Sequence, residues 1–177
     1  LNAEPQALAK PIGTVTPAYF PHTGSPKALV ILVEFQDVKF KTSDPVATFT
    51  HYLKGADGEE APEANNAYVT KGMVNYGSVS QYFNDMSQGK FTPQFDIVGP
   101  VTVSKNSAYY GGNVGNSTDV NFAQMIAEAC KGVSTKVNFA DYDQNNDGYV
   151  DLVYVIYAGY SESINGNSSD CLWPKSG

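Results

Sequence analysis

The sequence is short of basic residues, and this shortage excludes several kinds of partner. Its 177 residues include 11 Lys and Arg against 18 Asp and Glu, which gives a formal net charge of −7 at pH 7. Such an excess of negative charge disfavours binding to nucleic acid or to an anionic membrane surface. We therefore expect no nucleic-acid partner.

Histidine, cysteine and long apolar runs are also scarce. The 2 histidines, His22 and His51, lack partners at metal-ligand spacing, and we interpret both as surface residues, with His51 on the exposed side of a short helix. The 2 cysteines, Cys130 and Cys171, can form a disulfide or remain thiols, and they form no metal-binding motif. No run of about 18 apolar residues occurs, so the sequence predicts no membrane span. Phosphate-binding loops, dinucleotide fingerprints and G-x-S-x-G motifs are absent too.

The remaining composition suits one folded domain. Hydrophobic residues make up 42% of the chain and charged residues only 16%, which is not the composition of a disordered protein. Residues 1–26 are rich in proline and lack sustained periodicity, so we interpret them as an extended leader or linker. We interpret residues 27–177 as the N-terminal portion of a domain, which we expect to continue beyond the chain end.

Strand and helix patterns alternate along residues 27–177. The apolar run at 28–35 predicts a strand that is buried on both faces. A helix from Asp44 to Gly55 and a capped helix over 78–89 follow. Strands are then predicted at 91–98 and 101–103, separated by a Gly99-Pro100 turn. The last elements are a helix that Asp119 caps and that runs through Lys131, and an apolar strand at 152–158. This alternation predicts an α/β fold with helices packed on a mixed, twisted sheet.

The most informative stretch is an acidic loop directly before the last apolar strand. Oxygen donors recur there at every second position, which lets alternate side chains of a tight loop converge on one point. Hard oxygen donors without His or Cys favour Ca²⁺ over zinc. The predicted ligands are Asp141, Asp143, Asn145, Asp147, the Tyr149 carbonyl and Asp151.

This loop resembles an EF-hand but departs from it in two ways. Counted from Asp143, the sixth position is Gly148, as an EF-hand requires, but the twelfth is Tyr154 where an EF-hand has a bidentate Glu. The segment that follows is also a strand candidate rather than a helix. We interpret the loop as a single structural calcium site; a solvated acidic turn is the alternative, because Asp, Asn and Gly are common turn residues.

Several segments, taken in order, resemble the immune inhibitor A metallopeptidases (peptidase family M six). They are ALVILVEFQDV at 28–38, GSVSQYF at 77–83, SQGKF at 87–91, DIVGP at 96–100, YYG at 109–111, FADYD at 139–143, DGYVDL at 147–152, IYAG at 156–159 and WP at 173–174. The resemblance implies the N-terminal part of a zincin-like zinc endopeptidase that is secreted or on the cell surface, of bacterial type, with a protein or peptide substrate.

The family's zinc site is an H-E-x-x-H helix, and no segment of this chain matches it. No zinc ligand or catalytic residue therefore transfers to any position here, and we expect zinc only in a C-terminal part of the intact protein. The chain as given is predicted to be inactive alone. A calcium-dependent adhesion or glycan-binding module, without enzymatic activity, is the alternative function, and the sequence does not determine an oligomeric state.

Overall fold

The centre of the fold is strand β1 (Lys27–Glu34), as the apolar run predicts. A computed structural model describes residues 20–59, 65–66, 69–70, 77–164 and 170–176, and within it the β1 residues from Ala28 to Val33 have no exposed surface. Successive side chains enter opposite cores because strand residues alternate between faces. Leu29, Ile31 and Val33 join one cluster, and the residues between them join the other.

Two strands flank β1 and pair with it in parallel. Strand β4 (Gln94–Thr102) lies on one side and β5 (Val153–Tyr157) on the other, so the order is β4-β1-β5. The α/β prediction is confirmed, but these three strands form a parallel sheet and not the predicted mixed one. A separate antiparallel pair joins β2 (Asn65–Asn66) to β3 (Val69–Thr70).

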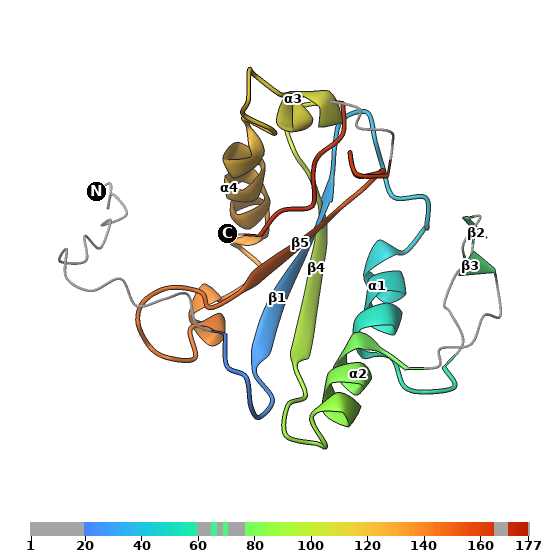
Figure 1. Cartoon of the computed structure of the whole chain (residues 1–177), viewed down its shortest axis with the longest axis vertical. Helices are drawn as coiled ribbons and strands as arrows, with labels where there is room; N and C mark the ends of the chain where they lie inside the picture. The colour runs from blue at the N-terminus through green and yellow to red at the C-terminus, as the bar shows by residue number, and fades with distance from the viewer. Residues whose placement is uncertain (1–19, 60–64, 67–68, 71–76, 165–169, 177) are drawn as a thin grey trace.

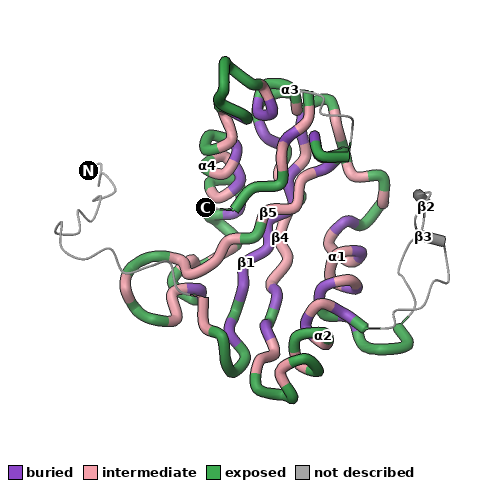
Figure 2. The backbone as a smooth tube through the Cα atoms, viewed as in Figure 1, coloured by how far each residue is buried: buried purple, intermediate pink, exposed green. Residues whose placement is uncertain are grey.

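Helices cover both faces of the sheet, as Figure 1 shows. Helices α1 (Pro45–Lys54) and α2 (Val79–Met86) lie on one side, and α4 (Phe122–Val133) lies on the other with the short α3 (Ser107–Gly111) at its end. The buried residues follow the central strand and the helix surfaces that face it (Figure 2). In the described part of the chain, every helix is too short or too polar to cross a membrane.

The predicted caps of the first two helices are confirmed. The Asp44 carboxylate accepts a hydrogen bond from the Ala47 amide at 2.9 Å, and the Ser78 hydroxyl accepts one from the Gln81 amide at 3.3 Å. Gly89 ends the second helix region at φ +78°, a conformation that glycine adopts without steric cost. Two apolar residues of α2 nevertheless stay exposed, at 59% for Tyr82 and 69% for Met86.

Three local predictions are wrong for tertiary reasons. Helix α4 begins after Asn121, because the side chain of Asp119 is directed into a buried cluster instead of capping the helix. The Gly99-Pro100 pair lies inside β4, where a Cβ on Gly99 would come within 2.7 Å of the Leu32 carbonyl oxygen. His51 is 4% exposed and packs inside the α1 region, so it is not a surface residue.

The predicted leader divides into two parts. Residues 1–19 lie outside the described residues. Residues 20–26 contact the sheet, since Gly24 exchanges backbone hydrogen bonds with Lys90 and Thr92, and Phe20 packs against the Ala28 side of the core. The boundary at residue 26 stays a prediction.

Candidate metal centre

The acidic loop lies between a 3-10 helix, η1 (Phe139–Tyr142), and strand β5. Asp143 is at its centre. One carboxylate oxygen of Asp143 accepts the Asp147 amide at 2.9 Å, and the other accepts the Gly148 amide at 2.8 Å. Gly148 has φ +89°, so the chain can turn sharply enough to bring both amides to one side chain. The loop therefore curls around Asp143, as the sequence pattern predicts.

Two more of the predicted ligands belong to the same turn. The Asn145 side-chain oxygen also accepts the Asp147 amide at 2.9 Å, and the Asp147 carboxylate accepts the Tyr149 amide at 2.9 Å. These are local side-chain to backbone hydrogen bonds of the kind that Asp and Asn form in turns. They hold the side chains of Asp143, Asn145 and Asp147 in one turn.

Gln144 connects this loop to the start of the sheet. Its backbone amide donates to the Asp151 carboxylate at 2.9 Å, and its side-chain amide donates to the same carboxylate at 3.2 Å. The Gln144 side chain also accepts the Lys27 amide at 3.0 Å and donates to the Lys27 carbonyl at 3.2 Å. The loop is thereby joined to β1 as well as to β5. Sequence reasoning missed Gln144 because nothing local distinguishes a polar residue between two predicted ligands.

Asp141 and Tyr149 flank the turn around Asp143. The Asp141 carboxylate accepts the Asn138 side-chain amide at 2.9 Å, which places it on η1. The Tyr149 side chain is 59% exposed, and only its carbonyl was expected to bind a cation. Among the described residues, no three His, Cys, Asp or Glu side chains come together as a ready metal site. The donor set of carboxylate, amide and carbonyl oxygens nonetheless fits the chemistry that Ca²⁺ prefers.

Tyr142 joins η1 to strand β4. Its hydroxyl donates to the Asp96 carboxylate at 3.1 Å. Burial, together with the negative charges of Asp96 and Asp141, raises the pKa of Tyr142 to about 12. The neutral phenol is thus the form that the fold stabilises here.

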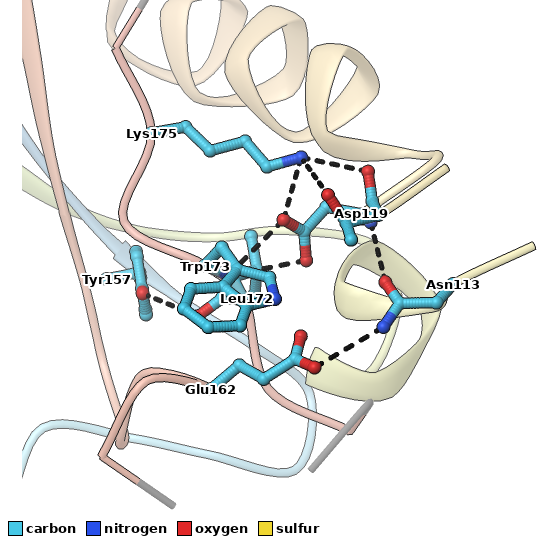
Figure 3. Close-up of polar contacts among 8 residues, drawn as sticks. Asn113, Asp119, Tyr157, Glu162, Leu172, Trp173 and Lys175 are labelled. Atoms are coloured by element: carbon cyan, nitrogen blue, oxygen red, sulfur yellow. Dashed lines mark hydrogen bonds and ion pairs between the residues drawn. The ribbon is translucent and has the colours of Figure 1, made fainter. Parts of the chain in front are cut away.

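A second acidic cluster lies near Tyr157, which is the last residue of β5 and so is at the end of that strand away from the loop (Figure 3). Asp119 is 3% exposed; its carboxylate contacts the Lys175 ammonium at 2.8 Å and accepts the Trp173 amide at 3.3 Å. The Asn113 side-chain oxygen accepts the Asp119 amide at 2.9 Å, and its nitrogen donates to Glu162 at 3.4 Å. We name these four side chains, Asn113, Asp119, Glu162 and Lys175, the Asp119–Glu162 cluster.

No local motif reveals the Asp119–Glu162 cluster, because its members come from three separate stretches of sequence. The sequence instead predicted that Asp119 caps a helix. The structure gives Asp119 φ +49°, a left-handed conformation that Asp tolerates better than most residues. That conformation directs the chain toward α4 while the carboxylate remains inside the cluster.

Several polar and aromatic residues outside the two acidic regions have structural roles. Asp37 accepts the Ser107 amide at 2.9 Å at the start of α3, and Glu34 contacts Lys39 at 3.4 Å. Tyr110 from the Tyr-Tyr-Gly segment is fully buried. Cys130 is a free thiol in this structure, and burial raises its pKa.

Comparisons with known proteins agree with the sequence resemblance. A family model described as "Immune inhibitor A peptidase M6, catalytic domain" matches residues 20–176. The chain is also 24% identical over 169 residues to the "Pre-pro-metalloprotease PrtV" of Vibrio cholerae serotype O1, in strains M66-2 and ATCC 39315 / El Tor Inaba N16961. The match covers 83% of this chain but 18% of each relative, so the chain spans less than a fifth of their length.

Proposed function

Because the chain belongs to the immune inhibitor A (M6) peptidase family, we propose that it is the N-terminal scaffold and calcium-binding part of a secreted zinc metalloendopeptidase. The observation that carries this proposal is the family match over residues 20–176, which includes both the sheet and the acidic loop. In the intact protein, the reaction is peptide-bond hydrolysis by a metal-activated water, and the substrate is a protein or peptide.

Zinc does not fit the residues of this chain. Catalytic zinc needs three protein ligands, and the common helical arrangement places two His one turn apart with a Glu that activates water. The chain has 2 histidines, His22 and His51, which are 29 positions apart in sequence and belong to no such motif. We therefore assign no catalytic step to these residues and infer that the chain is inactive alone.

Calcium fits the acidic loop. Asp143, Asn145 and Asp147 already lie within one turn, and Gln144 links the Asp151 carboxylate to β1. A bound Ca²⁺ would balance the repulsion between these carboxylates and would hold the loop in the conformation that begins β5. The role that we infer for this ion is structural.

The family match favours the peptidase over a calcium-dependent adhesion module. The similarity to a bacterial pre-pro-metalloprotease supports a bacterial protein that is secreted or carried on the cell surface. The loop lacks a bidentate Glu at its twelfth position, so its affinity for calcium should be modest. The millimolar calcium found outside cells would still fill such a site.

Two measurements test the proposal. The first compares the melting temperature in calcium with that in EDTA, and we expect a higher value in calcium because the ion binds the folded chain. An unchanged melting temperature would contradict the calcium part.

The second measurement is hydrolysis of casein by this chain and by the longest natural protein that contains it. We expect hydrolysis from the longer protein alone, and we expect it to disappear when the Glu of an H-E-x-x-H helix is changed to Gln. A longer protein without such a helix, or with activity that survives this change, would reject the enzyme assignment.

A further inference from the structure

The Asp119–Glu162 cluster contains a carboxylate oxygen that the protein does not satisfy. Glu162 is 4% exposed, and its Oε1 accepts one long hydrogen bond, 3.4 Å from the Asn113 amide nitrogen. No hydrogen-bond donor reaches its Oε2 from the part of the chain that the structure describes. A buried carboxylate normally accepts several hydrogen bonds or pairs with a cation, because desolvation of its charge is costly.

The charges in the cluster do not balance either. Asp119 and Glu162 are both acidic, and Lys175 is the cation that the structure places with them. The Lys175 ammonium is engaged on the Asp119 side, where it contacts the carboxylate at 2.8 Å and the Thr118 carbonyl and hydroxyl at 2.8 and 3.1 Å. Figure 3 shows Lys175 on one side of Asp119 and Glu162 on the other. One buried negative charge is therefore left over at Glu162.

We propose that Glu162 forms part of a second binding site for a hard divalent cation, with Ca²⁺ as the ion that suits it. Glu162 Oε2 supplies an open anionic oxygen, while the Asn113 side chain directs its nitrogen to the other oxygen of this carboxylate and its own oxygen to the Asp119 amide. A carboxylate oxygen favours Ca²⁺, which completes its coordination with backbone carbonyls and water.

The position of the cluster gives the cation a structural consequence. The Glu162 amide donates to the Leu172 carbonyl at 2.8 Å, and the Tyr157 hydroxyl donates to the same carbonyl at 3.0 Å. Asp119 contacts the neighbouring Trp173 amide. A cation at Glu162 would thus fasten the loop after β5 and the segment 170–176 to the stretch between α3 and α4.

This site is independent of the acidic loop, so each can fail without the other. The test starts from a chain in which Asp143 and Asp147 are both changed to Asn, which disables the loop site. Thermal unfolding and calorimetric titration with Ca²⁺ are then compared with and without Glu162→Gln. We expect the parent to keep a calcium-dependent rise in melting temperature and Glu162→Gln to abolish that rise.

The matched control is Asp57→Asn, which removes one negative charge from an exposed turn. We expect it to leave the residual calcium response unchanged. A residual response that Glu162→Gln does not reduce, or no residual response at all, overturns the second site. A normal response in the chain with an intact loop would still support the loop site.

A second variant tests whether calcium reverses a loss of stability. Asn113→Asp replaces the amide that donates to Glu162 with another carboxylate. Without calcium the two carboxylates repel, so the melting temperature should fall; with calcium the added oxygen donor should raise the affinity for the ion and restore stability. If calcium raises the melting temperature of this variant no more than that of Glu162→Gln, the proposal is wrong.

Discussion

The two acidic regions of this molecule are built in opposite ways. In the loop before β5, the carboxylates lie within eleven positions of sequence and accept hydrogen bonds from their own backbone, as Asp143 does from Asp147 and Gly148. In the Asp119–Glu162 cluster, the carboxylates are more than forty positions apart and almost fully buried. Their partners come from distant parts of the chain.

This difference decides how each region responds to the loss of a charge. A loop carboxylate remains close to water, so its removal mainly takes away a turn contact and a potential cation ligand. A buried carboxylate that pairs with a cation leaves its partner uncompensated when it is removed, which costs much more. Substitutions in the two regions should therefore differ both in size and in their dependence on calcium.

The largest effect is expected from Asp119→Ala. The substitution leaves the Trp173 amide and Lys175 without their carboxylate and places Ala at φ +49°. We expect a loss of about 3 kcal/mol in the free energy of unfolding, near the lower end for a broken buried pair because Lys175 is partly exposed. Urea unfolding measures this loss. Asp119→Asn, which tolerates the same backbone conformation, should lose less; equal losses would show that the charge is unimportant.

A smaller and calcium-dependent effect is expected from Asp147→Ala. The loss in the free energy of unfolding should be about 1–2 kcal/mol in calcium and clearly less in EDTA, because ligand binding adds to stability only when the ligand is present. Thermal unfolding in both buffers gives the comparison. Asp57→Ala is the matched control, since it removes a negative charge from an exposed turn outside the loop and should leave the calcium response unchanged. Equal losses with and without calcium would reject a ligand role for Asp147.

Gln144→Ala tests the link between the loop and β1. The side chain makes three hydrogen bonds, two to the Lys27 backbone and one to Asp151, at exposed or half-buried positions. Because such bonds replace bonds to water, we expect a net loss of about 1 kcal/mol in the free energy of unfolding. Hydrogen exchange of the Lys27 amide should quicken more than that of amides inside β4. Unchanged exchange at Lys27 would mean that the link does not restrain the strand.

The smallest effect at neutral pH is expected at two tyrosines, one near each region. Tyr142 donates to Asp96 beside the loop, and Tyr157 donates to the Leu172 carbonyl beside the cluster. Burial, together with nearby negative charge, raises the pKa of each to about 12. The neutral phenol is favoured in the folded state, so its contribution is full below pH 10 and is lost as the pH rises toward 12.

The measurement for these tyrosines is urea unfolding at a series of alkaline pH values. Tyr142→Phe and Tyr157→Phe should each show a shallower decline of stability above pH 10 than the unchanged chain. If neither variant alters the slope, other groups govern the alkaline unfolding.

The sequence alone determined the features that depend on neighbouring residues. An uninterrupted apolar run specified β1 because a strand with cores on both faces needs apolar side chains in both directions. Asp44 and Ser78 were identifiable as caps because their hydrogen bonds span only three residues. The turn around Asp143 was predictable for the same reason.

Tertiary structure decided everything that depends on residues far apart in the chain. Periodicity assigns α2 an apolar face, but it does not determine whether another element covers that face, and Tyr82 and Met86 are exposed. His51 is buried because β4 and α2 contact its helix, α1, which the sequence of the helix alone does not reveal. Strand direction in the sheet likewise depends on how the connections cross, so the parallel pairing of β4, β1 and β5 could not be read from their composition.

The same division holds for the candidate sites. The six ligands predicted for the loop rest on their spacing and stay a prediction. Gln144 and the Asp119–Glu162 cluster were not identifiable in this way, because a hydrogen bond between residues 144 and 27 or 113 and 162 leaves no periodic trace in sequence. Local geometry is encoded by a few adjacent residues and their backbone preferences. Burial of a charge arises only when separate segments meet and exclude water, which the folded chain alone determines.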